Sequence, residues 1–212
     1  MKKYFLILLT LYNCSSYNFY GIALKEQKMN SIVSKQHINY NIKKNTLEIP
    51  KSIIFIIADG TGIGQYTLSY YSNGQFAPAR FNHIGLVSTH PNDGECSTSC
   101  KRVTDSAASG TALSSGKKTY NGAIAVDLDK NPTKTMLEWA QEKGMSTGLV
   151  APSSVTHATP ASFGAHIDYR KKEYDIASQY ANGNIDVILG GGKKFWSDSL
   201  INIYVKNNGQ FI

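Results

Sequence analysis

The chain has 212 residues, a hydrophobic fraction of 42% and a net charge of +7 at pH 7. These values are ordinary for a globular protein and suffice for one domain with a buried core. The lysines are scattered and form no basic stripe, so we expect a solvated surface and no nucleic-acid partner. Attraction of an anionic substrate is compatible with the charge.

The N-terminus has the pattern of an export signal. Met1–Lys3 is basic, and Tyr4–Tyr12 is an apolar run too short to cross a bilayer. The sequence predicts a signal peptide over residues 1–23, cleaved after Ala23. Lipidation at Cys14 is a second way in which the leader could be processed. An uncleaved anchor or a buried apolar segment is the alternative. We therefore expect an exported protein of the periplasm or cell envelope.

The remaining cysteines agree with an oxidising compartment. Cys96 and Cys100 are the only pair outside the leader, and we expect a small loop disulfide. A zinc half-site is the alternative, but it would need further soft ligands. Residues 24–50 are polar and lack a clear period, which indicates an arm or linker.

From residue 51 onward, predicted strands and helices alternate. Ser52–Ala58 is a continuous apolar run, typical of a central parallel strand buried on both faces. The other expected strands are Ile84–Thr89, Ala123–Val126, Ser146–Ala151 and Ile185–Leu189. The expected helices are Gln65–Asn73, one opening at Asp105, Thr133–Lys143, Thr159–Ile167 and Lys172–Ala181. This alternation predicts an α/β fold with a mostly parallel sheet flanked by helices.

A serine opens one of these helices, within the segment Val103–Ala112, which reads VTDSAASGTA. Ser106 lies in the first turn, where backbone N–H groups lack intrahelical partners and the helix dipole favours negative charge. Its hydroxyl could therefore become an oxyanion or carry a phosphate. The alternative is a simple helix cap followed by a small packing face.

Other polar groups follow predicted strands. Asp59 ends the first strand, and the glycine spacing after it does not fit a dinucleotide fingerprint. His157 and Thr159 follow a later strand, two residues apart, so both can face one site. Carboxylate, hydroxyl and imidazole ligands suit Mg²⁺ or Zn²⁺. Arg170 is suited to grip phosphate with two nitrogens. Taken singly, each residue also has a structural explanation. Asp59 and Thr159 could be helix caps, His157 a loop residue and Arg170 a surface cation.

At this point the sequence resembles the alkaline phosphatases. The resemblance rests on motifs spread in order from Ser52 to Trp196. They are Ile56–Gly60 with Gly62, Val103–Ser109, Lys118–Ile124, Thr156–Ala161, Ala165–His166 with Arg170, and Asp186–Gly192. The resemblance implies that residues 51–212 are the N-terminal part of the catalytic domain of a phosphate monoesterase that uses Zn²⁺ and Mg²⁺. Its substrates would be small phosphate monoesters, and it would form a homodimer.

The resemblance also implies a role for each matching residue. Ser106 would be the nucleophile that becomes phosphoserine, and its oxygen would also contact a metal ion. Asp59 would ligate a zinc ion and the magnesium ion, and Thr159 the magnesium ion. His157 occupies a position where family members carry Asp or His, so the identity of the third metal stays open. The remaining roles are phosphate clamping by Arg170 and orientation of that arginine by Asp105.

Alkaline phosphatases are about twice this length, and the second half of their chain completes the zinc sites. We therefore expect a truncated member or fragment, with poor solubility, because a parallel sheet without its later strands exposes an apolar edge. One alternative is that this chain alone is catalytically inactive. Another is a related phosphodiesterase or sulfatase, against which the serine motif argues. A serine peptidase is disfavoured because the sequence has no Gly-x-Ser-x-Gly elbow.

Overall fold

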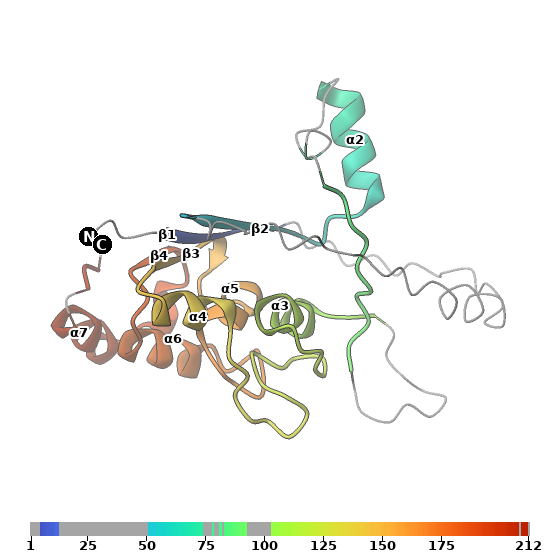
Figure 1. The fold of residues 1–212 in the computed structure, drawn as a ribbon. Helices are drawn as coiled ribbons and strands as arrows, with labels where there is room; N and C mark the ends of the chain where they lie inside the picture. Colours follow the sequence, from blue (N-terminus) through green and yellow to red (C-terminus); the bar gives the residue numbers. More distant parts are fainter. Residues whose placement is uncertain are drawn as a thin grey trace. The chain divides into compact units, whose positions relative to one another are not determined.

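The computed structural model describes residues 5–12, 51–73, 78, 81, 83–92, 103–207 and 209–211. Within them lies a parallel four-stranded sheet with the order β2-β1-β3-β4 (Figure 1). The strands are β1 (Phe5–Tyr12), β2 (Ile53–Asp59), β3 (Ser146–Ser154) and β4 (Val187–Gly191). The helices are α2 (Ile63–Asn73), α3 (Ser106–Ser115), α4 (Met136–Glu142), α5 (Ala158–Gly164), α6 (Glu173–Asn182) and α7 (Asp198–Lys206), with a 3-10 turn at Lys193–Phe195.

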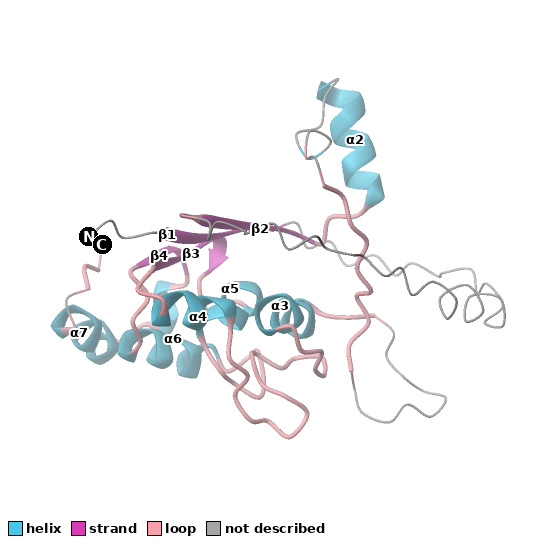
Figure 2. Cartoon of the chain, in the orientation of Figure 1, coloured by secondary structure: helices cyan, strands magenta, loops and turns pink. Residues whose placement is uncertain are grey.

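Helices α3 to α6 lie against one face of this sheet (Figure 2). The core between the two layers holds large buried side chains from both, among them Phe163, Tyr180, Leu149 and Ile176. Phe55 of β2 packs on Phe163 with ring centroids 5.7 Å apart. The expected α/β class with a mostly parallel sheet is therefore confirmed.

The apolar N-terminal segment forms the inner strand β1. Leu6 is paired with Ile53 of β2 on one side and with Thr147 of β3 on the other. A run of β-forming residues can pair with two parallel strands at once in this way. Removal of residues 1–23 as a signal peptide, and export, stay predictions.

The expectation that the first strand after the arm is central and buried on both faces is wrong. Strand β2 lies at the edge of the described sheet. Phe55 and Ile57 face the helical layer, whereas Ile54 and Ile56 are 63% and 59% exposed. The reason is that the described helices cover only one face of the sheet, so alternate side chains of β2 have nothing packed on them.

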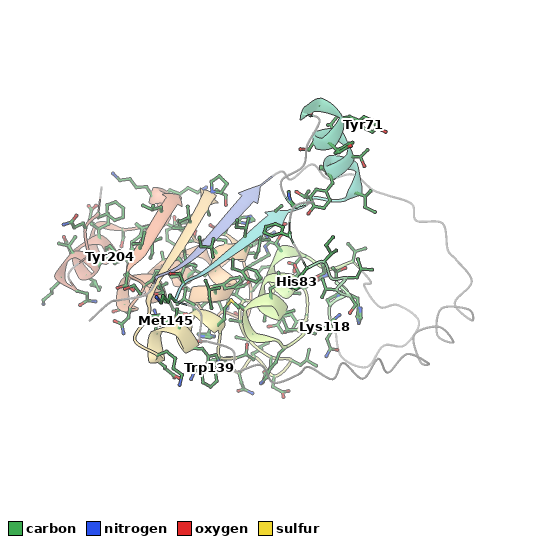
Figure 3. All side chains as sticks on the ribbon, turned by 45° about the horizontal axis from the view of Figure 1, so that its top comes forward. Tyr71, His83, Lys118, Trp139, Met145 and Tyr204 are labelled. Carbon is green, nitrogen blue, oxygen red and sulfur yellow. The ribbon has the colours of Figure 1, made fainter. Side chains whose placement is uncertain are left out.

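The predicted strand at Ile84–Thr89 is also wrong, because residues 83–92 have no regular structure. Leu86 is fully exposed, so its apolar pattern does not reflect burial in a sheet. The segment is instead held by Lys118, whose Nζ donates to the carbonyls of Ser88 at 3.1 Å and His90 at 2.8 Å. Figure 3 labels Lys118, which follows α3, and His83, at the start of the segment that Lys118 contacts.

The predicted strand Ala123–Val126 is reduced to isolated bridges. Ile124 pairs with Ile167, and this pairing also explains why the helix expected over Thr159–Ile167 ends at Gly164. The segment 123–126 is tied to α3 by Thr111, whose hydroxyl donates to the carbonyl of Ala123 and accepts from the N–H of Ala125. A backbone φ of 45° at Ala125 prevents a regular strand there.

The other predicted elements are confirmed, with shifted ends. Helix α4 begins after Thr135, which forms a reciprocal capping box with Glu138 and so excludes Thr133 and Lys134 from the helix. Its residues Leu137 and Ala140 are buried as expected. Helix α7 was not predicted. It begins after Ser197, whose side chain accepts from the N–H of Leu200.

Some predictions fall on residues outside the described ranges. These are the polar arm over residues 24–50, lipidation at Cys14 and the pairing of Cys96 with Cys100. In the described ranges, no helix is both long enough and apolar enough to span a bilayer.

Helices α3 and α5 approach closely because Gly110 faces Ser162. A Cβ placed on Gly110 would lie 2.8 Å from the Ser162 hydroxyl, which itself donates to the carbonyl of Ala158 at 2.8 Å. This contact sets the distance between the helix that begins with Ser106 and the helix that contains Thr159. Packing of α3 on α5 therefore positions two of the predicted site residues.

We expect Gly110→Ala to lower the free energy of unfolding by about 1–3 kcal/mol, because the added methyl must displace a hydrogen-bonded side chain. The matched control is Gly64→Ala in α2, where no atom lies within 4 Å of the added Cβ. That variant should be neutral or stabilising by up to about 1 kcal/mol, as alanine favours helices. Urea denaturation measures both. Equal stability of the two variants would contradict the packing argument.

Candidate functional site

Ser106 is the first residue of α3, and Asp105 caps that helix. Asp105 has extended backbone angles (φ −98°, ψ 173°), and its Oδ1 accepts from the N–H of Ala108 at 2.9 Å. A carboxylate at this end also interacts favourably with the helix dipole. The small residues Ala107 and Ala108 are buried, so the serine lies on a helix end that is fixed in the core.

The Ser106 hydroxyl points at the carboxylate that ends β2. Ser106 Oγ donates to Asp59, 2.9 Å from Oδ2 and 3.2 Å from Oδ1. The hydroxyl of Thr159 on α5 donates to the same Oδ2 at 2.9 Å. One carboxylate therefore joins a strand end and the first turns of two helices, as expected for the carboxyl edge of a parallel sheet.

Arg170 lies on the other side of Asp105. Its Nη1 donates to Asp105 Oδ2 at 3.1 Å, and its Nη2 lies 3.3 Å from His157 Nε2. The N–H of Arg170 also donates to the carbonyl of Gly122 at 2.8 Å, which fixes the main chain. Since a guanidinium only donates, His157 Nε2 must accept, and the imidazole is neutral in this geometry.

The surroundings of His157 favour the same neutral form. Burial lowers the pKa of His157, and the charge of Arg170 lowers it further, while Glu173 and Asp59 act in the opposite direction. A neutral imidazole is the form that ligates a metal ion or accepts a hydrogen bond.

The oxygen donors around Asp59 fit a hard cation. A carboxylate and the hydroxyls of Ser106 and Thr159 converge within hydrogen-bonding distance, and such oxygen ligands are those that Mg²⁺ prefers. Across the described part of the chain, however, no group of three or more His, Cys, Asp or Glu side chains is close enough to hold a metal ion. The described residues thus fit part of a magnesium site and do not by themselves fit a zinc site.

The structure brings together all the residues that the sequence singled out. They are Asp59, Asp105, Ser106, His157, Thr159 and Arg170. Sequence reasoning assigned no role to Asn121, which accepts from the N–H of Asp105 at 2.9 Å and donates to the carbonyl of Val103 at 3.0 Å. The turn signal at Tyr120–Gly122 places Asn121 in a loop, but no local pattern shows that this loop supports the serine motif.

Fold and site together define an α/β protein with a serine at a helix N-terminus, hydrogen-bonded to a carboxylate and close to an arginine that is ion-paired with an aspartate. The family model described as alkaline phosphatase matches residues 50–210. The chain therefore belongs to the alkaline phosphatase family.

Known proteins that resemble the chain agree with this assignment. Alkaline phosphatase 3 of Bacillus subtilis is 47% identical over 165 residues, covering 71% of this chain and 34% of its own. Alkaline phosphatase of Escherichia coli is 34% identical over 174 residues, which cover 70% of this chain and 36% of the Escherichia coli protein. The chain thus spans about a third of the length of these relatives.

Solved structures give the same result. A cold-active alkaline phosphatase from Shewanella sp. superposes with a TM-score of 0.63 at 37% identity, over 73% of this chain and 39% of that one. Alkaline phosphatase from the Antarctic bacterium TAB5 superposes with a TM-score of 0.64 at 36% sequence identity, over 70% of this chain and 43% of that one. A TAB5 variant with one histidine replaced by aspartate is described with Mg bound in its M3 site.

The lowered pKa of His157 predicts a stability loss on acidification. Below the unfolded value of 6.5, the unfolded chain takes up this proton before the folded one, so the free energy of unfolding falls until the folded pKa is reached. His157→Gln, which keeps an acceptor for Arg170, should lack this part of the fall, which begins as the pH drops through the unfolded value of 6.5. Replacement of the exposed His83 by Gln is the control. An unchanged pH slope in His157→Gln would contradict the prediction.

Proposed function

We propose that this chain supplies the nucleophile, the phosphate clamp and part of the magnesium site of a metal-dependent phosphate monoesterase that works through a phosphoserine at Ser106. The observation that carries the proposal is the position of Ser106 Oγ. It lies at a helix N-terminus, 2.9 Å from Asp59 Oδ2, next to the ion pair of Arg170 with Asp105. Proximity of a hydroxyl, an acceptor for its proton and a cation for phosphate suits phosphoryl transfer.

Each residue has a task in the reaction. Arg170 binds two oxygens of the phosphoryl group, and Asp105 holds the guanidinium in place. Ser106 Oγ forms a bond to phosphorus while the bond from phosphorus to the ester oxygen breaks, and the ester oxygen leaves as an alkoxide that takes up a proton from solvent. The serine proton moves toward the Asp59 carboxylate, to which the hydroxyl already donates. Water then hydrolyses the phosphoserine and releases phosphate.

Mg²⁺ would be held by Asp59 and Thr159, with His157 as the third candidate ligand. A divalent cation there supplies positive charge next to the attacking oxygen and the phosphoryl oxygens. Zinc is implied by the family resemblance alone, and its site needs ligands beyond those that the described residues bring together. We therefore also propose that these 212 residues alone do not turn over substrate, and that the active protein, as its organism produces it, holds zinc ligands in addition to the described residues. The homodimer implied by the resemblance belongs to the same proposal.

We further propose that the protein is exported, with residues 1–23 removed. The support is the basic start followed by a short apolar run. The mass of the protein recovered from the producing cells tests this: a mature chain beginning at Leu24 is expected, and a chain that keeps residues 1–23 would contradict it.

Ser106→Ala should lower kcat for an aryl phosphate by roughly three orders of magnitude or more, since it removes the nucleophile. The assay uses the protein as its organism produces it, with Mg²⁺ and Zn²⁺ added. Ser115→Ala at the other end of the same helix is the matched control, because its hydroxyl contacts local backbone: it donates to the carbonyl of Thr111 at 2.7 Å and accepts from the N–H of Lys117 at 3.2 Å. A Ser106→Ala variant that keeps the activity of Ser115→Ala would overturn the proposal.

A further inference from the structure

Glu173 begins helix α6, and its carboxylate turns back to the chain that follows β3. Glu173 Oε2 accepts from the hydroxyl of Thr156 at 2.6 Å and from that of Ser154 at 3.1 Å. The two hydroxyls are also hydrogen-bonded to each other. A carboxylate in the first turn of a helix is already stabilised by the helix dipole and by water. Two protein hydroxyls that donate to one of its oxygens therefore indicate that Glu173 also holds the segment that carries them.

The position of Thr156 makes this contact consequential. Thr156 is completely buried, so water cannot easily replace the carboxylate as the partner of its hydroxyl. It is followed directly by His157, and Thr159 lies two residues further on. Glu173 itself follows Arg170 by three residues. One carboxylate therefore links the segment that carries two candidate magnesium ligands to the segment that carries the phosphate clamp.

We infer that Glu173 is a positioning residue, which sets the distance between Arg170 and the pair His157 and Thr159 by holding the buried hydroxyl of Thr156. The inference rests on the proposed function, because the groups it positions are those assigned to magnesium and phosphate. Glu173 is not one of the residues proposed to bind the phosphoryl group or the metal ion. Its effect passes through Thr156, as outer partners of metal ligands act by fixing the ligand's orientation.

Asp175 provides a matched control. It lies in the first turn of the same helix, carries the same charge and is exposed. Asp175→Asn therefore removes one charge near the helix N-terminus without changing the contact with Thr156. Glu173→Gln also removes the charge but keeps an oxygen that can accept from both hydroxyls, whereas Glu173→Ala removes the acceptor altogether.

Two readouts test the inference on the protein as its organism produces it. The first is the Mg²⁺ concentration that gives half-maximal hydrolysis of an aryl phosphate. The second is hydrogen exchange of the amides of residues 155–159 in the absence of added metal. Glu173→Ala should raise the Mg²⁺ requirement by about tenfold or more and speed exchange in this segment, while Glu173→Gln should stay within about threefold of the unmodified protein.

A double-mutant cycle separates positioning from general stability. Thr156→Val should reproduce Glu173→Ala, and the double variant should be no worse than either single change, because both remove one contact. Asp175→Asn should match the unmodified protein in both readouts. The inference is overturned if Glu173→Ala behaves like Asp175→Asn, or if its exchange increases along the whole chain and its effect adds to that of Thr156→Val.

The two proposals can fail separately. If the unmodified protein hydrolyses no phosphate monoester with Mg²⁺ and Zn²⁺ present, the proposed function fails. Exchange at residues 155–159 then decides alone: faster exchange in Glu173→Ala than in Asp175→Asn supports positioning of the segment, and equal exchange overturns it.

Discussion

The candidate site depends on the carboxylate of Asp59. It ends β2 and accepts hydrogen bonds from two hydroxyls, that of Ser106 at the start of α3 and that of Thr159 in the first turn of α5. These contacts join a strand and two helices that are far apart in the sequence. The distance between the two helices is set elsewhere, by the close approach of Gly110 to Ser162. The chemistry of the edge therefore rests on the packing of small residues in the core.

A second constraint orders the positive side of the site. Arg170 is held between Asp105 and His157, and its main chain is bonded to Gly122. A guanidinium fixed in this way loses less freedom when it binds a phosphate, and its planar geometry matches two phosphoryl oxygens. The same arrangement favours neutral His157. The negative Asp59, next to Ser106, and the positive Arg170, paired with Asp105, therefore lie on two sides of the start of α3.

Much of the candidate site could be predicted from the sequence, because the signals for its helix cap and strand ends are local. The serine motif predicts its own helix and cap, and strand ends place Asp59 and His157 near one edge. What failed depended on distant partners. Ile84–Thr89 has a strand-like pattern, but no described strand lies beside it. Ile54 is an apolar residue of the kind found in cores, but no described helix covers it. The contact between Glu173 and Thr156 is invisible locally, because the residues meet only after α5 and the following turn have folded.

The central claim is that Ser106 becomes phosphorylated during turnover. The most direct test mixes the protein, as its organism produces it, with an aryl phosphate, Mg²⁺ and Zn²⁺. The reaction is stopped with acid and the peptides are weighed by mass spectrometry. We expect one added phosphoryl group on the peptide containing Ser106, and none in Ser106→Ala. Product formation with no phosphoryl group on that peptide at any time, or with the group on a different residue, would contradict it.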